Sequence, residues 1–365
     1  TISSISNGDE FKVDIKRNGD LLYNCWLEIE LNTTLSRTNI SSLSVIDYIE
    51  LLINDKVIDK HSYRYLHSSY NTNYNYDELN NLESQLYLKN TTSNQKIKIP
   101  LQFWFCKNIG QVLPLISLQN SKLQFNIKIS NSLYIVNNSL DYNIHSLKVW
   151  CNYIFLDNDE RKKFAYNKQS YLIELVQENI KSLNFNNGNN EVTSNIELDL
   201  YHPTKYFIWY LGLDSPTEIG NSTHKNNIYM TKALLKLEGE ERFEEQNYNY
   251  FKHYQFLESN KTNYINNNYQ KSINFLSNLS FCQNNENLLQ NRLSPLYYMY
   301  SFALNPKEYQ PSGTCNFSKF KNVEFIIKHK SLNSSNTTTS TLHLFAIHYN
   351  ILNIENGIGN LLYSN

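Results

Sequence analysis

The chain has 365 residues, a formal net charge of −1 at pH 7, and 18% charged residues. Because it has no excess of Lys and Arg, it lacks the basic surface that binds phosphates, and we expect no direct nucleic-acid binding. No apolar run reaches the roughly 18 residues of a transmembrane helix, so a protein that crosses a membrane by helices is excluded.

The cysteines also limit the class of protein. The five of them, Cys25, Cys106, Cys151, Cys282 and Cys315, are odd in number and widely spaced, and no Cys-x-x-Cys occurs. This pattern disfavours a disulfide framework and a zinc site, and it predicts a reducing compartment.

Short segments with alternating apolar residues dominate the first part of the chain. In Phe11–Lys16 (FKVDIK) residues 11, 13 and 15 fall on one face of a strand, and the turn Arg17-Asn18-Gly19-Asp20 follows. Tyr76–Leu88 (YDELNNLESQLYL) has the pattern of a short helix. Leu123–Ile129 (LQFNIKI) again alternates as a strand does.

The second part continues in the same way after one helix. Asp157–Ala165 (DNDERKKFA) starts with acidic and ends with basic residues, as the helix dipole prefers. Leu342–Leu352 (LHLFAIHYNIL) is a strongly apolar strand. Together the segments predict an all-β chain of many short strands, a sandwich or barrel, with few short helices.

A weak similarity between two segments of the sequence suggests two β-domains. Val149–Glu160 and Phe345–Asn356 each resemble an apolar closing strand followed by polar residues, and each has a Tyr with a Leu three positions later. We therefore expect two domains of similar size, joined near Asp157–Lys168.

Polar, Asn-rich stretches are expected to be exposed loops. They are Asn131–Asn143, Asn184–Asn195 and Asn260–Asn291, and the Ser-, Thr- and Asn-rich segment Ser331–Ser340 is expected to be a mobile loop.

No motif predicts catalysis, a cofactor or a metal. The chain lacks a P-loop, a Gly-x-Gly-x-x-Gly loop, a His-Glu-x-x-His pair and a Gly-x-Ser-x-Gly elbow. His343 and His348 are five residues apart, so in a strand they point to opposite faces, which is poor metal geometry. The acidic cluster Glu238–Glu245 is interpreted as a solvated loop rather than a cation site. We predict neither an enzyme nor a cofactor.

The segment Tyr300–Phe320 (YSFALNPKEYQPSGTCNFSKF) contains two prolines and a glycine, in a chain with only 7 Pro and 10 Gly. Proline restricts φ and glycine permits positive φ, so a loop of defined shape is predicted between two strands. We expect strands at Tyr300–Leu304 and Thr314–Phe320, with a corner at Asn305–Gly313.

This segment resembles the signature loop of the major capsid proteins of nucleocytoplasmic large DNA viruses. Other segments are similar to motifs of that family and occur in the family's order. They are Lys16–Leu31 with its Arg-Asn-Gly-Asp-Leu turn, Val45–Ser62, Ile99–Ile129 with Pro-Leu-x-Phe-Trp-Phe, Leu156–Ala165, Tyr201–Leu211, Leu237–Phe251 and His348–Asn365.

The resemblance implies a double jelly roll, with two consecutive eight-stranded antiparallel jelly rolls at residues 1–156 and 169–365 and a connector at 157–168. It also implies a homotrimer that forms a pseudo-hexagonal capsomer of an icosahedral shell around the genome of a large DNA virus. Lateral contacts with neighbouring capsomers, contacts with minor capsid proteins, a place in the virion and assembly in the host cell cytoplasm are implied as well.

The residues that carry the resemblance are a structural signature and not a ligand site, with no catalytic, cofactor-binding or metal-binding member. They are Asn18, Gly19, Asp20, Pro100, Phe103, Trp104, Phe105, Pro114, Pro306, Pro311, Gly313, Asn316 and Phe317. The rings of Phe103–Phe105 are expected either in a core or at a subunit contact.

Three alternatives stay open at this point. The chain could be a capsid paralogue or an assembly scaffold of the same fold, like the poxvirus scaffold protein. It could be a glycan-releasing hydrolase with paired jelly rolls, which would need acidic residues in a cleft. It could be a lectin-like binding module, which the many aromatic residues permit.

Overall fold

The computed structural model describes residues 5–33, 40–73, 87–88, 94–131, 142–183, 191–212, 228–259, 297–331 and 340–363. The chain divides into two compact units: unit 1 comprises Thr1–Gln177 and Ile347–Asn365, and unit 2 comprises Glu178–Ala346. Within the described residues, no helix has both the length and the apolar character needed to cross a membrane.

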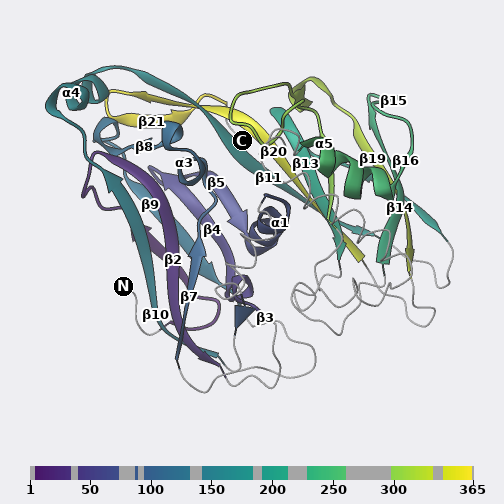
Figure 1. The fold of residues 1–365 in the computed structure, drawn as a ribbon, viewed down its shortest axis with the longest axis horizontal. Coiled ribbons are helices and arrows are strands. Elements are labelled where there is room, and N and C mark those ends of the chain that lie inside the picture. The colour runs from purple at the N-terminus through teal and green to yellow at the C-terminus, as the bar shows by residue number, and fades with distance from the viewer. Residues whose placement is uncertain are drawn as a thin grey trace, which may run out of the picture. The chain divides into compact units, whose positions relative to one another are not determined.

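Among the described residues up to 166, most belong to strands, with a few short helices (Figure 1). These elements are β1 (Glu10–Asp14), β2 (Leu21–Thr33), β3 (Ile40–Ser41), β4 (Ile46–Ile53), β5 (Lys56–Ser62), α1 (Tyr63–Asn73), β6 (Tyr87–Leu88), β7 (Gln95–Pro100), α3 (Trp104–Lys107), β8 (Leu113–Pro114), β9 (Leu123–Ile129), β10 (Tyr142–Ile154) and α4 (Asn158–Tyr166), with 3₁₀ turns at Ser42–Val45, Ile109–Gln111 and Leu115–Ser117.

The remaining elements are again mostly strands. They are β11 (Gln169–Leu183), β12 (Val192–Glu197), β13 (Pro203–Gly212), β14 (Ile228–Leu237), β15 (Glu240–Glu241), β16 (Gln246–Asn247), a π-helical turn (Tyr250–Tyr254), α5 (Gln255–Ser259), β17 (Tyr298–Ser301), β18 (Cys315–Asn316), a 3₁₀ turn (Phe317–Lys319), β19 (Val323–Ser331), β20 (Ser340–Glu355) and β21 (Ile358–Leu361). The long strands β11 and β20 contribute residues to both units.

Unit 1 contains two antiparallel sheets, with the strand orders β1-β9-β4-β5 and β10-β2-β7. From Cys25 to Leu31, the odd-numbered residues of β2 are buried and the even-numbered ones are half-buried. This alternation is expected of a sheet that covers a core with one face and meets solvent with the other. The predicted strand at Phe11–Lys16 is confirmed as β1, which pairs with β9.

The predicted strand Leu123–Ile129 is confirmed as β9, but both of its faces are covered. Gln124 and Asn126 of this strand are buried, and neighbouring carboxylates accept hydrogen bonds from their side-chain amides. Gln124 Nε2 donates to Asp14 Oδ1 at 2.6 Å, and Asn126 Nδ2 donates to Glu50 Oε2 at 2.9 Å. A polar position in an alternating pattern can thus be an inner position when hydrogen-bonded partners surround it.

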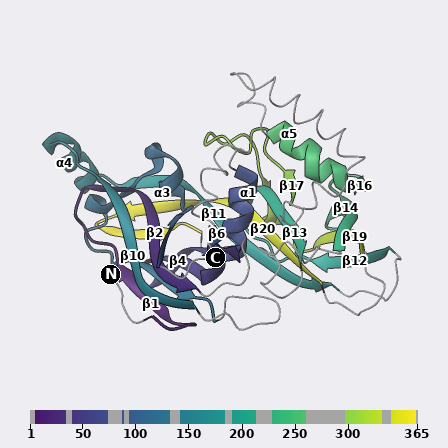
Figure 2. The ribbon, with the colours of Figure 1, turned by 60° about the horizontal axis from the view of Figure 1, so that its bottom comes forward.

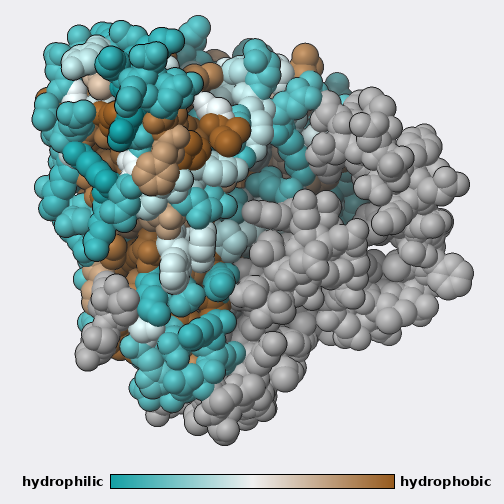
Figure 3. Space-filling view, turned by 60° about the vertical axis from the view of Figure 1, so that its left-hand side comes forward, coloured by the Kyte–Doolittle hydropathy of each residue, from teal (hydrophilic) through white to brown (hydrophobic). Residues whose placement is uncertain are grey.

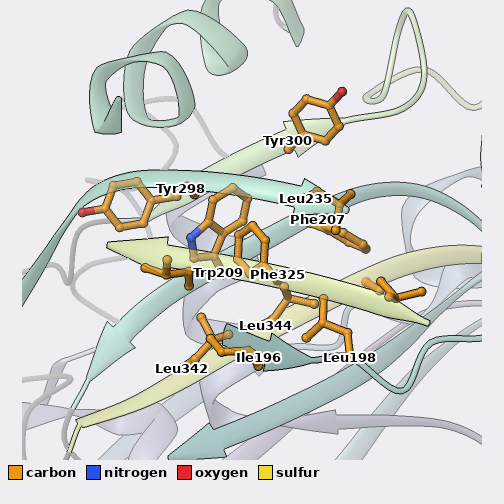
Figure 4. Close-up of a cluster of buried hydrophobic side chains, with 14 of the residues drawn as sticks. Ile196, Leu198, Phe207, Trp209, Leu235, Tyr298, Tyr300, Phe325, Leu342 and Leu344 are labelled. Atoms are coloured by element: carbon orange, nitrogen blue, oxygen red, sulfur yellow. The ribbon is translucent and has the colours of Figure 1, made fainter. Parts of the chain in front are cut away.

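Unit 2 contains an antiparallel sheet with the order β12-β19-β14-β15, in which β12, β19 and β14 lie side by side (Figure 2). The order β11-β20-β13-β17 forms a second sheet. Side chains from both sheets meet in one core, where Trp209 is fully buried (Figure 4). The Trp209 ring centroid lies 5.3 Å from that of Phe251, 5.9 Å from that of Tyr298 and 5.2 Å from that of Phe325.

The predicted helix at Asp157–Ala165 is confirmed as α4. Asp157 is its N-cap, and Oδ1 of Asp157 accepts hydrogen bonds from the backbone N–H groups of Asp159 at 3.1 Å and Glu160 at 2.9 Å. The second predicted helix, Tyr76–Leu88, lies outside the described residues except for its end. There Tyr87 and Leu88 form β6, because they pair with β3 instead.

Most of the predicted loop residues also lie outside the described part of the chain. The loop prediction for Asn184–Asn195 extends too far, because Val192–Glu197 is β12 and pairs with β19 along its whole length. Likewise, Tyr142 and Asn143 already belong to β10.

Contacts divide the chain after Gln177 and before Ile347, and the long strands β11 and β20 each run through one of these boundaries. Two consecutive jelly rolls at residues 1–156 and 169–365, with a connector at 157–168, remain a prediction.

Candidate functional site

Among the described residues, no group of three or more His, Cys, Asp or Glu side chains could hold a metal ion. The predicted signature residues instead lie at three places in the fold, and each is built from backbone turns and buried rings. Two of the three places are in unit 1 and one is in unit 2.

The first place is the turn between β1 and β2, which holds Asn18, Gly19 and Asp20. Asn18 is exposed, but Asp20 is only 4% exposed. Asp20 Oδ2 accepts a hydrogen bond from the backbone N–H of Leu156 at 2.8 Å, and Asp20 Oδ1 accepts one from Nε of Arg161 at 2.9 Å. The turn is thereby fastened to the start of α4.

Gly19 is required at this turn by a close approach. A Cβ at Gly19 would lie 2.6 Å from Cβ of Tyr153, which is closer than real Cβ contacts. Arg17, the first residue of the predicted turn, donates to the carbonyl oxygens of Gln119 at 2.7 Å and Leu118 at 2.6 Å.

Asp20→Ala is expected to lower the free energy of unfolding by about 2–3 kcal/mol, because the N–H of Leu156 loses its acceptor and Arg161 loses its ion pair. Urea denaturation followed by circular dichroism measures this free energy. Asn18→Ala is the control and should cost less than about 0.5 kcal/mol, because Asn18 lies in the same turn and is exposed. Equal effects of the two variants would contradict this role of Asp20.

The second place lies between β7 and β9 and holds Pro100, Phe103, Trp104, Phe105 and Pro114. The carbonyl oxygen of Pro100, the last residue of β7, accepts the hydroxyl of Tyr70. Pro114 is in β8 and pairs with Leu21 of β2. Both prolines therefore stand at strand ends or in a short strand, where their missing N–H is tolerated.

The three rings at 103–105 are buried inside unit 1, at 0%, 2% and 0% exposure respectively. Phe103 stacks on His61 with the ring centroids 4.4 Å apart, and on Phe125 at 5.8 Å. His61 in turn pairs with Asp59 at 2.9 Å, and both side chains are buried. Of the two roles open to these rings, the burial supports core packing.

The third place is the segment between β17 and β19, which holds Pro306, Pro311, Gly313, Asn316 and Phe317. The predicted corner is present, but its strands are shorter than expected. The first strand ends at Ser301, and Leu304 is 82% exposed. The second strand is Cys315–Asn316 only, followed by a 3₁₀ turn.

Hydrogen bonds explain why the strands end early. The N–H of Leu304 donates to Ser312 O at 3.2 Å and that of Asn305 donates to Ser312 Oγ at 2.8 Å, so the segment closes on itself instead of pairing with a neighbouring strand. Lys205 Nζ donates to Glu308 O at 2.8 Å and holds the corner from β13. Pro306 is buried, whereas Pro311 is exposed.

The end of this segment returns to the core. Phe317 is fully buried, with its ring centroid 5.4 Å from that of Phe207. Oδ1 of Asn316 accepts the N–H of Ser318 at 3.1 Å and caps the 3₁₀ turn. The signature thus combines a hydrogen-bonded corner with a buried anchor.

Gly313→Val is expected to lower the free energy of unfolding by about 2–3 kcal/mol and to reduce the yield of assembled protein. Gly313 has a φ of +128°, and its Cβ would lie 3.3 Å from the carbonyl oxygen of Phe302. Thermal denaturation and sizing chromatography measure the two effects. Gly110→Val is the control, because Gly110 is exposed and has no positive φ. Normal stability and assembly of Gly313→Val would contradict the prediction.

Two residues of the acidic cluster Glu238–Glu245 have partners within the chain itself. Glu245 pairs with Lys328 at 2.5 Å and Lys232 at 2.9 Å, and these ammonium groups lower the pKa of Glu245 below its ordinary value. Glu238 accepts the backbone N–H groups of Lys321 and Asn322. These contacts agree with a structural role on the surface of unit 2.

Exposed aromatic side chains are candidate contact residues that the sequence did not single out. Trp150 of β10 is 45% exposed and stacks on Trp26 of β2, with the ring centroids 6.3 Å apart. Phe155 and Tyr166, which follow it in unit 1, are 71% and 86% exposed. Figure 3 shows apolar surface between hydrophilic side chains. A tryptophan at an outward position of a strand was the available signal.

Comparisons with known proteins cover nearly the whole chain. Residues 2–157 match the model of the major capsid protein N-terminus, and residues 293–360 match the model of the large eukaryotic DNA virus major capsid protein. The chain is 30% identical to the major capsid protein of Pyramimonas orientalis virus over 98% of this chain and 87% of that protein. It is 27% identical to the major capsid protein of Paramecium bursaria Chlorella virus 1, over 99% of this chain and 89% of that protein.

Solved structures agree in fold. The crystal structure of PBCV-1 VP54, fitted into a reconstruction of the virophage Sputnik, has a TM-score of 0.82 at 24% identity and covers 99% of this chain and 94% of that one. The Faustovirus major capsid protein has a TM-score of 0.67 at 10% identity, covering 96% and 88%. These similarities confirm the predicted all-β, double jelly-roll class, whereas eight strands in each jelly roll remain a prediction.

Proposed function

Because this chain belongs to the major capsid proteins of large eukaryotic DNA viruses, we propose that it forms a homotrimeric, pseudo-hexagonal capsomer that tiles an icosahedral shell around the viral genome. The observation that carries this proposal is a similarity that runs along almost the whole chain and through both units. The relatives are structural capsid proteins and not enzymes.

The physical reason for a trimer lies in the two β-units of each chain. Three chains with two similar lobes each present six lobes, so that an object with three-fold symmetry can occupy a position in a hexagonal lattice. In such a lattice the chain makes lateral contacts with neighbouring capsomers and contacts with minor capsid proteins. Its place is the virion shell, and assembly takes place in the host cell cytoplasm.

Two features of the described residues support a role in repeated assembly. Rings at Trp150, Phe155 and Tyr166 offer exposed apolar area for contacts with other chains. The corner at residues 305–313 is held by hydrogen bonds at both ends and by Lys205, so it presents one shape in every copy. A surface repeated many times needs such uniformity.

The test is the solution mass of the purified chain, measured by light scattering behind a sizing column over a concentration series. We expect a concentration-independent mass three times the 43.0 kDa of one chain. Electron microscopy of concentrated samples should then show hexagonal arrays or closed shells. A monomer at every concentration, with no arrays, would overturn the trimeric capsomer.

A further inference from the structure

Three of the cysteines that are far apart in the sequence meet in unit 1. Cys25 of β2 lies opposite Cys151 of β10 in the antiparallel register, and their Sγ atoms are 3.4 Å apart. The thiol of Cys106, from α3, lies near that of Cys25 and contributes to its raised pKa. The described cysteines are free thiols. Cys25 is fully buried, whereas Cys106 and Cys151 are half-buried.

The geometry of the Cys25 and Cys151 pair suits a disulfide. Directly opposed residues of an antiparallel pair have Cα atoms roughly 4.5–5.5 Å apart, which is within the range that a disulfide spans. The two Sγ atoms must approach from 3.4 Å to a bond length of roughly 2.05 Å, which small side-chain rotations provide. Beside the pair the register shifts, because Cys151 faces Cys25 whereas Asn152 faces Tyr23, so Asn24 of β2 is the extra residue of a β-bulge.

We propose that Cys25 and Cys151 are an oxidation site that closes into a cross-strand disulfide when the protein meets a peroxide. This link would join β2 covalently to β10, the strand that leads to the α4 connector. The proposal concerns unit 1 alone and does not depend on the oligomeric state.

The protonation of the pair favours this order of events. The hydrogen bond from Cys25 lowers the pKa of Cys151, and the neighbouring thiols of Cys106 and Cys151, together with burial, raise the pKa of Cys25. The partly exposed Cys151 is therefore the more acidic thiol of the pair and the one that a small oxidant reaches, and the buried Cys25 is the thiol that resolves the product.

The step balances as two reactions. The Cys151 thiolate attacks one peroxide oxygen, the O–O bond breaks, and Cys151 becomes a sulfenic acid while the other oxygen leaves as hydroxide or alkoxide and takes up a proton. The Cys25 sulfur then attacks Cys151 Sγ, the S–O bond breaks, and hydroxide leaves and takes up the proton of Cys25 as water. Two sulfurs are oxidised by two electrons in total, and one peroxide is reduced.

The test uses the purified full-length chain, treated with a small excess of hydrogen peroxide, alkylated, digested without reductant and analysed by mass spectrometry. We expect a linked pair of peptides that contain Cys25 and Cys151, lighter by two hydrogen atoms than the separate peptides. The link spans 126 positions of the sequence, so the melting temperature should rise by roughly 5–15 °C and fall back on reduction.

Three matched variants make the result specific. Cys151→Ser, at a half-buried position, should fold in its reduced form and lose both the link and the shift in melting temperature. Cys106→Ser and Cys315→Ser, the second of which lies in unit 2, should keep both. Separately alkylated Cys25 and Cys151 after oxidation of the wild-type chain, or a link between Cys25 and Cys106, would overturn the proposal. This peptide map decides the matter even if a variant does not fold.

Discussion

Phe103→Ala is expected to lower the free energy of unfolding by about 3–5 kcal/mol, because a fully buried ring is replaced by a cavity. Phe103 lies against His61 at 4.4 Å, Phe105 at 5.8 Å and Phe125 at 5.8 Å, which come from three different parts of unit 1. None of these rings can fill the space alone, since each is fixed by its own strand or turn. Urea denaturation followed by near-ultraviolet circular dichroism measures the loss.

Phe103→Ala would also affect the buried side chains of His61 and Asp59, which lie beside the ring. His61 and Asp59 are 2% and 1% exposed, and removal of the ring above His61 opens this pair to water. Ile109→Ala is the control, since Ile109 is only a few residues away and is 65% exposed. It should change the free energy of unfolding by less than about 0.5 kcal/mol. A Phe103→Ala variant as stable as this control would refute the core role of the aromatic motif.

Trp209→Ala is expected to lower the free energy of unfolding by about 3–5 kcal/mol as well, now in unit 2. Trp209 is fully buried, and its ring meets Phe251, Tyr298 and Phe325 at centroid distances of 5.2–5.9 Å. These contacts join strands of both sheets of the unit 2 core (Figure 4). Far-ultraviolet circular dichroism in a urea series measures the effect without relying on tryptophan fluorescence.

Trp150→Ala makes the same chemical change at a half-exposed position and serves as the control. Its loss is limited to the stacking on Trp26 and to partial burial, so we expect about 1 kcal/mol or less. If both tryptophan variants lowered the free energy of unfolding equally, the burial of Trp209 would not explain its effect, and the prediction would be wrong. Because Trp150 is a candidate contact residue, its variant also reports on assembly by light scattering.

Local patterns were sufficient for the identity of many elements. The alternation in Phe11–Lys16 and Leu123–Ile129 predicted β1 and β9, and the acidic-to-basic order of Asp157–Ala165 predicted α4. The positions of the signature turns were also correct, since Gly19 and Gly313 both meet neighbouring atoms that leave little or no room for a side chain. The strand and helix patterns depend on residues that are close in the sequence, where backbone preferences and periodicity act directly.

Local patterns failed where a partner from elsewhere in the chain decides the outcome. Leu304 looked like the end of a core strand, but Ser312 takes the backbone hydrogen bonds of this segment, and the side chain is exposed. Asn195 looked like part of a loop, but β19 supplies a strand partner to it. Gln124 and Asn126 of β9 looked outward, but they are buried and donate hydrogen bonds to carboxylates.

The cysteines show most clearly what the sequence predicts and what only the tertiary structure decides. Composition and motif order were enough to predict an all-β capsid protein without catalytic or metal-binding motifs, because periodicity, charge and short motifs are properties of the linear chain. The wide spacing of Cys25, Cys106 and Cys151 gave no sign that their thiols meet. Their proximity depends on the register of β2 against β10 and on the place of α3, and long-range strand pairing arises from side chains across the whole unit.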